Sequence, residues 1–319
     1  MPNLQETLRE INKTNGVGSL EQISKLESIE IERIPTGCFS LDWVMGGGLP
    51  SGRVIEIYGM ESSGKTMLSL FIIREIQKRG GKAAFFDVEN AFSPEFGKAI
   101  GVDIDKLIFS QETSMTKVLD WIVELVKTGE LDIIVLDSVA SLLPDEELEE
   151  SVGKQNIALQ ARMMSRGLRK LVGIASKTKT SIIFLNQIRQ KVGVFYGDPN
   201  TTSGGLALKF FSSIRIQVKK GKNIEEKEEV IGNVMKIEVK KNKVGPPFRT
   251  TEFDLIYKAG VDVVSDTFNF AVSSKVITKE GNTYSFEKMK LGVGQEQAKE
   301  ALKSNKELLA KLNKTLTAK

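Results

Sequence analysis

The chain has 319 residues, 40% of them hydrophobic, and 45 Lys and Arg against 41 Asp and Glu give it a net charge of +4. Its length suggests about two domains, and its apolar content excludes a disordered chain or a small disulfide-stapled scaffold. There is no histidine and one cysteine, Cys38, which excludes Ser-His-Asp and Cys-His catalysis and zinc sites built from these residues. No apolar run is long enough to span a bilayer, and Met1–Ile11 lacks the apolar core of a signal peptide, so we expect a soluble cytoplasmic protein.

Residues 1–33 are expected to form a small N-terminal segment. Apolar residues recur at helical spacing from Leu4 to Ile11 and again over Leu20–Leu26, and Ile29–Ile31 is typical of a strand. A segment of this size cannot bury a core of its own. We therefore expect it to pack on the rest of the chain or on a neighbouring copy.

Residues 34–262 are expected to form an α/β core around a mostly parallel sheet. From Val54 onward, strand and helix patterns alternate, which is typical of parallel strands joined by right-handed crossovers. A helix is expected over Met67–Arg79, and Ile214–Val218 and Val234–Val239 are expected to extend the sheet as antiparallel strands. The expected parallel strands are short and almost wholly apolar, as in strands buried on both faces: Val54–Tyr58, Ala83–Asp87, Ile133–Asp137 and Ser181–Leu185.

Residues 263–319 are expected to form a small, lysine-rich C-terminal α+β domain. Its last part is expected to be one helix, Glu296–Leu316, whose leucines lie in one buried stripe while its lysines face the solvent. The segment Leu291–Lys319 contains six lysines and three glutamates. Two interpretations remain open: these lysines form a solvated helix face, or they form an accessory surface for nucleic acid.

Gly59–Thr66 matches the pattern G-x-x-x-x-G-K-[ST] of a phosphate-binding P-loop. The segment follows an expected strand and opens an expected helix, as that motif requires. Glycines allow the backbone to wrap a phosphate, and the helix N-terminus directs N–H groups towards it. Lys65 would neutralise the β- and γ-phosphate oxygens, and the Thr66 hydroxyl would ligate Mg²⁺. The candidate residues for nucleotide binding in this segment are Gly59, Glu61, Ser62, Ser63, Gly64, Lys65, Thr66 and Met67.

Three polar residues lie at the carboxyl ends of expected strands, the edge where an α/β sheet binds its ligands. Asp137 is expected to be the second partner of Mg²⁺. Glu89 is the best candidate to activate the attacking water in a chain without histidine, and a helix cap or a surface residue is the alternative. Gln187 ends a further strand, where its amide could contact the γ-phosphate. GTP is disfavoured because Asn242–Gly245 lacks the aspartate of an N-K-x-D motif.

A long loop, Ile188–Gly205, follows Gln187 and contains cations, adjacent aromatic residues and several glycines. Arg189 and Lys191 could contact phosphates while apolar or aromatic groups such as Phe195 contact bases, which is how single strands are held without sequence readout. Loops of this length are usually functional or disordered. A lid over a substrate is the competing interpretation.

Several segments of the chain resemble the bacterial RecA recombinase family, in the family's order and over nearly the whole length. They are Thr36–Asp42, Glu56–Thr66, Ala161–Ser165, Asn186–Arg189, Gly204–Phe210 and Lys241–Lys243. The resemblance implies a RecA-type P-loop ATPase core and an N-terminal segment that serves polymerisation. It also implies an ATP- and Mg²⁺-dependent recombinase that forms helical filaments on single-stranded DNA and exchanges strands with homologous double-stranded DNA in recombination and repair.

The resemblance implies roles for residues around the nucleotide. Glu89 matches the family's catalytic carboxylate, and Gln187 matches its γ-phosphate sensor. Phe96 and Tyr257 match aromatic residues near the adenine. Phe96 stands where the family usually has tyrosine, so the ring could still stack but would offer no hydroxyl for a hydrogen bond.

The resemblance also implies residues that bind a second subunit and DNA. Lys241 and Lys243 match lysines that reach the ATP of the neighbouring subunit. Phe210, with Lys209 beside it, matches a residue of the subunit interface. The residues that match the DNA-binding loops are Arg162, Ser165 and Arg169 beside the first loop, and Arg189, Lys191, Val192, Phe195, Gly204 and Gly205 in the second.

Two other functions would use the same ATPase core. A hexameric helicase or branch-migration motor would assemble as a closed ring, whereas the recombinase would assemble as a helical filament, so imaging separates the two. A protein that only coats single strands would use ATP as a switch. It would therefore fail a strand-exchange assay.

Overall fold

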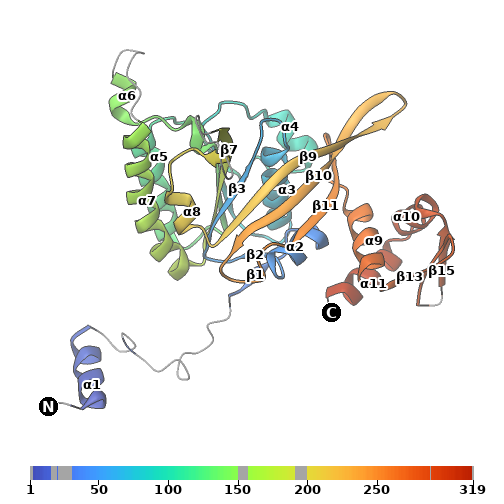
Figure 1. The fold of residues 1–319 in the computed structure, drawn as a ribbon, viewed down its shortest axis with the longest axis horizontal. Coiled ribbons are helices and arrows are strands. Elements are labelled where there is room, and N and C mark those ends of the chain that lie inside the picture. Colours follow the sequence, from blue (N-terminus) through green and yellow to red (C-terminus); the bar gives the residue numbers. More distant parts are fainter. Residues whose placement is uncertain are drawn as a thin grey trace. The chain divides into compact units, whose positions relative to one another are not determined.

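A computed structural model describes residues 3–15, 20, 31–149, 157–190, 200–287 and 289–317 (Figure 1). Residues 1–32 form one compact unit and residues 33–319 form another. In the part of the chain so described, no helix is both long and apolar enough to cross a membrane.

The described part of the first unit contains helix α1 (Leu4–Asn15), which confirms the helical pattern that begins at Leu4. Asn3 and Glu6 cap the helix reciprocally, because Asn3 Oδ1 accepts from the Glu6 amide at 2.9 Å and Glu6 Oε2 accepts from the Asn3 amide at 3.1 Å. The helix expected over Leu20–Leu26 and the strand expected over Ile29–Ile31 lie almost wholly outside the described residues.

A ten-stranded sheet runs through the second unit in the order β12-β11-β10-β9-β3-β7-β6-β4-β5, with β8 paired to β7. Neighbouring strands are parallel from β9 to β5 and antiparallel from β9 to β12, so the expected mostly parallel α/β fold is confirmed. The strands are β3 (Val54–Gly59), β4 (Ala83–Asp87), β5 (Ile108–Ser110), β6 (Ile133–Asp137), β7 (Ser181–Gln190), β8 (Asn200–Thr202), β9 (Ile214–Glu226), β10 (Glu229–Asn242), β11 (Thr250–Ile256) and β12 (Gly260–Val261).

The direction of β9 corrects one expectation. The strand is parallel to β3, with Ile55 opposite Ile214, and it is antiparallel only to β10. The chain between Gln190 and Ile214 is long enough for the crossover that parallel neighbours need. In contrast to that long connection, only two residues join β9 to the antiparallel β10. The positive φ angles of these residues, Lys227 (49°) and Glu228 (71°), are typical of a type I′ hairpin.

Helices cover both faces of the sheet (Figure 1). One apolar core joins Ile55 and Ile57 of β3 to α2, α3 and α4, and a second core joins Val54 to α5, α7 and α8. Because side chains alternate along a strand, Glu56 points towards the same face as Val54. The helices are α2 (Phe39–Met45), α3 (Lys65–Gln77), α4 (Pro94–Ile100), α5 (Met115–Thr128), α6 (Asp145–Glu149), α7 (Ile157–Thr178) and α8 (Ala207–Phe211).

A third apolar core lies in the C-terminal part of the unit, which has the expected α+β composition. Three antiparallel strands pack there with three helices. These elements are α9 (Val263–Ser273), β13 (Ile277–Glu280), β14 (Thr283–Phe286), β15 (Met289–Val293), α10 (Gln295–Ser304) and α11 (Lys306–Thr317). A further two-stranded sheet in the unit pairs β1 (Arg33–Ile34) with β2 (Leu49–Pro50).

The single helix expected over Glu296–Leu316 is wrong, because the chain breaks into α10 and α11 at Asn305. Asn305 is extended, and its Oδ1 accepts from the Leu308 amide at 3.0 Å, so it caps the start of α11. The leucines of this segment also differ in burial. Leu302 and Leu312 are buried, whereas Leu308 and Leu309 are only partly covered.

Candidate functional site

The P-loop lies between β3 and α3 and has the backbone that its motif predicts. Ser62 and Gly64 are in the left-handed region, with φ of 54° and 90°. A Cβ on Gly59 would lie 2.3 Å from the Val218 carbonyl oxygen, so only glycine fits where the strand enters the loop. The Ser63 hydroxyl is buried without a hydrogen-bond partner among the described residues. Successive backbone N–H groups next to left-handed residues form a concave site for an anion, and the Ser63 hydroxyl adds a further donor.

A pocket of about 330 Å³ opens on this loop, a size suited to a nucleotide. It brings together the predicted residues of the P-loop with Glu89, Phe96, Asp137, Gln187 and Tyr257. Gly59 does not line the pocket, but its carbonyl oxygen accepts from Lys65. The complete lining is Glu61, Ser62, Ser63, Gly64, Lys65, Thr66, Met67, Glu89, Phe96, Asp137, Gln187, Lys220, Asn233, Leu255 and Tyr257.

Three of the lining residues were not predicted from the sequence: Lys220, Asn233 and Leu255. They come from β9, β10 and β11 and reach the pocket only through the pairing of these strands beside β3. No local motif marks them. The one available signal is Lys220, which belongs to the basic pair Lys219–Lys220.

The Lys65 ammonium is held inside the loop by main-chain oxygens. Its Nζ donates to the Met60 carbonyl at 2.9 Å and to the Gly59 carbonyl at 3.3 Å. Burial lowers the pKa of Lys65, while the charges of Asp137, Glu89 and Glu61 act in the opposite direction. These carboxylates therefore favour the charged form that a phosphate would need.

Thr66 and Asp137 form an oxygen-donor pair at the carboxyl ends of the strands. The Thr66 hydroxyl donates to Asp137 Oδ2. Burial raises the pKa of Asp137 to about 6, and the Glu89 and Asp87 charges add to this, although the Thr66 hydrogen bond and the Lys65 charge oppose it. A hydroxyl and a carboxylate are the hard ligands that Mg²⁺ prefers.

The residues that the structure describes contain no group of three or more His, Cys, Asp or Glu placed to hold a metal ion. A cage made of protein ligands alone is therefore absent from that part of the chain. Mg²⁺ commonly binds through one or two protein oxygens together with phosphates of the substrate. The pair Thr66 and Asp137 fits that mode.

Glu89 is fixed at the pocket by two hydrogen-bond donors. Its Oε1 accepts from Ser138 Oγ at 2.5 Å and from Gln187 Nε2 at 3.0 Å. The Glu89 side chain is exposed, so water has access to it. The helix-cap alternative fails for the helix that follows, because Ser93 caps α4 by accepting from the Phe96 amide at 3.3 Å.

The predicted DNA-binding residues fall partly within the described chain. Arg162, Ser165 and Arg169 lie three and four residues apart on α7, which places them on one side of the helix, and both arginines are exposed. Arg189 is also exposed, near the end of β7. Lys191, Val192 and Phe195 lie outside the described residues, and so does most of the expected first loop, which is placed around Gly153–Ile157.

Gly204 and Gly205 close the second loop with left-handed backbone, at φ of 77° and 72°. A Cβ on Gly205 would lie 2.7 Å from the Ala161 Cβ of α7, and one on Gly204 would lie 3.0 Å from Val139 Cγ1. Glycine is therefore required here both for backbone conformation and for space. The end of the loop has a fixed path against α7.

Lys241 and Lys243 do not reach the nucleotide pocket of their own chain. Lys241 Nζ donates to the Lys209 carbonyl at 2.5 Å and to the Phe210 carbonyl at 3.0 Å, and Lys243 Nζ donates to the Phe210 carbonyl at 3.2 Å. Burial, together with the charges of Lys243 and Arg215, lowers the pKa of Lys241 to about 8. Phe210 itself is 67% exposed.

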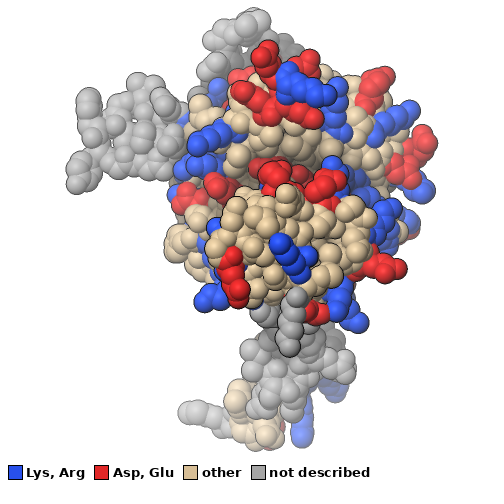
Figure 2. Space-filling model, turned by 90° about the vertical axis from the view of Figure 1, so that its right-hand side faces the viewer, with Lys and Arg blue, Asp and Glu red and all other residues tan. Residues whose placement is uncertain are grey.

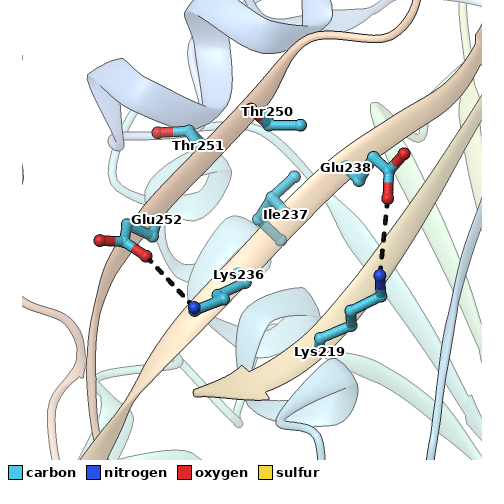
Figure 3. Close-up of a pocket in the computed structure, with 7 residues that line it drawn as sticks. All are labelled: Lys219, Lys236, Ile237, Glu238, Thr250, Thr251 and Glu252. Carbon is cyan, nitrogen blue, oxygen red and sulfur yellow. Dashed lines mark ion pairs between the residues drawn. The ribbon is translucent and has the colours of Figure 1, made fainter. Parts of the chain in front are cut away.

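A second pocket, of about 340 Å³, lies on the strands β9, β10 and β11 (Figure 3). Lys219 faces Glu238 at 3.6 Å, and Lys236 faces Glu252 at 3.9 Å. Each cation faces a carboxylate of a neighbouring strand, and Glu238 also pairs with Lys240 at 2.5 Å. Glu238 is half-buried and the other three side chains are exposed, and ion pairs at the surface contribute little to stability.

The lysines of the C-terminal helices are mostly exposed, as expected: Lys303, Lys306, Lys311 and Lys314 are exposed and Lys299 is half-buried. Lys311 pairs with Glu287. On the side of the molecule drawn in Figure 2, basic and acidic side chains are interspersed. The solvated-face and nucleic-acid interpretations of these lysines both stay open.

Comparison with known proteins finds relatives that match nearly the whole chain. The family model of the RecA N-terminal domain matches residues 2–262, and that of the RecA C-terminal domain matches residues 265–319. Protein RecA of Clostridium tetani is 43% identical over 317 residues, which cover 99% of this chain and 91% of the relative. Protein RecA of Bacillus subtilis is 44% identical over 307 residues, 96% of this chain and 88% of the relative. Protein RecA of Fusobacterium nucleatum subsp. nucleatum is 45% identical over 314 residues, 98% and 83% of the two chains.

Proposed function

Because the chain belongs to the RecA family, we propose that it binds Mg²⁺ and ATP at the P-loop pocket and couples ATP hydrolysis to assembly on single-stranded DNA. As a member of this family, the chain is a DNA-dependent ATPase and a recombinase in DNA repair. The observation that carries the proposal is the meeting of a P-loop, a hydroxyl–carboxylate pair and the Glu89–Gln187 pair in one pocket.

Each residue of the pocket has a chemical task in this proposal. The P-loop amides and Lys65 bind the phosphates, and Thr66 with Asp137 holds Mg²⁺, which supplies positive charge to the phosphate oxygens when bound. Glu89 orients and deprotonates the attacking water. Gln187 donates to Glu89 in this structure, and a γ-phosphate within its reach would compete for the same amide. Phe96 and Tyr257 line the pocket for the adenine.

The proposed ATP site is shared between two copies of the chain. Lys241 and Lys243 would act on the ATP of the neighbouring subunit, as cations supplied from outside a site do in phosphoryl transfer. The interface would include Lys209 and the exposed Phe210. Assembly of this kind, repeated in one direction, gives a helical filament when the rotation does not close.

The DNA partners follow from the exposed cations. Arg162, Ser165 and Arg169 with the loop from Arg189 to Gly205 would hold single-stranded DNA. The exposed lysines of α10 and α11 would attract homologous double-stranded DNA through its phosphates. Such a protein would work in the cytoplasm, on DNA.

The proposed division of labour follows three segments: residues 1–33 for polymerisation, 34–262 for the ATPase core with its DNA-binding loops, and 263–319 for duplex capture. The two family matches, which end at residue 262 and resume at residue 265, support the second boundary. The compact unit of residues 1–32 supports the first.

The experiment that tests the proposal compares the wild-type chain with Glu89→Gln. The variant keeps the shape and hydrogen bonding of the side chain but removes the base, so DNA-stimulated ATP hydrolysis should fall by about 10²–10⁴-fold. Binding of ATP and of single-stranded DNA should persist, and electron microscopy should show helical filaments. Near-normal hydrolysis removes Glu89 from the mechanism, and closed rings favour the hexameric motor.

A further inference from the structure

Lys241 and Lys243 are held in place by different means. Lys241 belongs to β10 and pairs there with Arg215 of β9, so the sheet fixes its main chain. Lys243 follows the last residue of the strand, and its amide donates to the Ser213 carbonyl at 2.8 Å. The direction of the Lys243 side chain therefore also depends on the contacts that hold the next residue, Val244.

Arg33 of β1 binds the main chain directly after Lys243. Its Nη2 donates to the Val244 carbonyl, and its Nη1 donates to the Met45 and Gly48 carbonyls, both at 3.3 Å. A guanidinium presents its donors in a rigid planar fork, so one side chain can bridge two separate segments of main chain. Arg33 therefore ties the loop that contains Lys243 to the turn between α2 and β2, which lies beside the end of β10 (Figure 1).

The turn between α2 and β2 is a well-defined anchor for this loop. Gly46, Gly47 and Gly48 have positive φ angles of 92°, 111° and 126°, a backbone that other residues rarely adopt. The amides of Gly47 and Gly48 donate to the Asp42 carbonyl at 2.8 and 3.2 Å, which closes the turn on itself. A Cβ on Gly48 would lie 2.7 Å from the Ile34 carbonyl oxygen, so the turn fits closely against β1.

Asn242, the last residue of β10, makes a second tie to the same turn. Its Nδ2 donates to the Met45 carbonyl at 3.0 Å, and its Oδ1 accepts from the Val244 amide at 3.0 Å. A Cβ on Gly245 would lie 3.1 Å from the Met45 carbonyl oxygen, so the loop passes close to the turn. The N–H of Val244 is thus held by Asn242 and its carbonyl by Arg33.

We propose that Arg33 is a positioning residue that directs the Lys243 ammonium towards the ATP of the neighbouring subunit. Arg33 does not line the nucleotide pocket of its own chain, so it acts through Lys243. Lys243 Nζ donates to the carbonyl of the exposed Phe210, so the side chain that Arg33 positions points to the proposed contact between subunits. This inference rests on the function proposed above and adds to it a residue outside the pocket.

Two variants and a matched control isolate this tie. Arg33→Gln removes the charge and the fork, and Arg33→Lys keeps the charge on a flexible stem that cannot bridge both segments in the same way. The control is Arg53→Gln. Burial and the charge of Arg53 lower the pKa of Arg33, so the two cations are close neighbours. Arg53 donates instead to Ser176 Oγ at 2.7 Å and to the Gly52 carbonyl at 3.3 Å.

The first measurement is ATP hydrolysis by the full-length chain on saturating oligo(dT), as a function of ATP concentration. A misplacement of about 1 Å caused by a change far from the chemistry can cost about 10²-fold in rate. We expect Arg33→Gln to lower kcat by about 10- to 100-fold, Arg33→Lys to lower it less, and Arg53→Gln to keep it. KM for ATP should stay within about twofold of the wild type, because the pocket in the same chain is unchanged.

The second measurement separates a positioning role from a structural one by mixing subunits. Where an Arg33→Gln subunit holds ATP and a Lys65→Ala subunit supplies the lysines, both halves of the shared site are intact. Turnover of this mixture should exceed the sum of the two variants alone. Mixing Arg33→Gln with the Lys241→Ala, Lys243→Ala variant should give no recovery, because both defects then lie on the same side of the interface.

Three results overturn the proposal: a wild-type kcat in Arg33→Gln, an equal loss in Arg53→Gln, or no recovery with Lys65→Ala. Normal hydrolysis by the Lys241→Ala, Lys243→Ala variant instead contradicts the shared site of the proposed function. If Arg33→Gln does not fold or does not bind oligo(dT), Arg33→Lys is judged by the same kcat and mixing tests.

Discussion

Asp137→Asn is expected to make the nucleotide-free protein more stable while removing its response to Mg²⁺ and ATP. The pKa of Asp137 rises from 3.8 to about 6, chiefly because the carboxyl group is buried. Each pKa unit corresponds to about 1.4 kcal/mol, so the ionised side chain costs the folded state roughly 3 kcal/mol above pH 6. Asparagine keeps an oxygen for the Thr66 hydroxyl and has no charge to desolvate.

The sign of the pH dependence follows from a folded-state pKa above the unfolded one. The stability that the protonated carboxyl provides is full below pH 3.8 and is lost as the pH rises through about 6. The variant should therefore exceed the wild type most at pH 7–8 and approach it towards pH 4–5. Because Lys65 loses a carboxylate neighbour in the variant, we expect a gain of about 1–3 kcal/mol at pH 7.5, or roughly 2–6 °C in Tm at this chain length.

The assay is thermal unfolding of both proteins at pH 5, 6, 7 and 8, with and without Mg²⁺ and ATP. Mg²⁺ and ATP should raise the Tm of the wild type and not that of the variant, since a ligand stabilises only the state that binds it. Asp132→Asn, just before the other end of β6, is the matched control. Asp132 is half-buried, accepts from the Lys82 amide at 2.8 Å and does not line the nucleotide pocket, so its replacement should leave the Tm response to Mg²⁺ and ATP intact. A lower Tm for Asp137→Asn at every pH would refute the reasoning.

Charge leads to three further predictions. Replacing Arg162 and Arg169 with Ala should lower the slope of log affinity for single-stranded DNA against log salt by about 1.4, since each phosphate contact contributes about 0.7; an unchanged slope removes both from the DNA surface. Lys241→Ala with Lys243→Ala should bind ATP but not hydrolyse it on DNA, and mixing with Lys65→Ala should restore part of the turnover. No recovery at any ratio contradicts a shared site. Because burial and neighbouring cations lower the pKa of Lys241 to about 8, ATPase activity should decline as the pH rises above 8, and less so in Lys241→Arg, whose guanidinium stays charged.

The phosphate site could be predicted from the sequence because its parts are local. The P-loop is one contiguous segment, and its glycines have a steric reason. A Cβ on Gly59, for example, would lie 2.3 Å from the Val218 carbonyl oxygen. Asp137 and Glu89 follow apolar strands, and parallel strands bring their carboxyl ends to one edge. The order of strands and motifs along the sequence was therefore sufficient to place these residues at the pocket.

The residues that the sequence did not reveal depend on strand pairing. Asn233 and Leu255 enter the nucleotide pocket only because β10 and β11 continue the sheet beyond β9. The buried ion pair of Glu56 with Arg215 likewise depends on a parallel register between β3 and β9, whereas the sequence pattern favoured an antiparallel β9. The break at Asn305 did have a local signal, since asparagine favours helix caps over helix interiors.

Lys241 and Lys243 illustrate why one chain gives an incomplete ATP site. Both donate to the Phe210 carbonyl at the C-terminal end of α8, where main-chain oxygens attract cations. A phosphate oxygen carries full charge and is a stronger acceptor than a carbonyl, so a neighbouring subunit's ATP could draw the lysines away. Phe210, exposed at the same helix end, is the proposed contact of that subunit. Subunit docking and completion of the ATP site would then occur at one place, which makes hydrolysis depend on assembly.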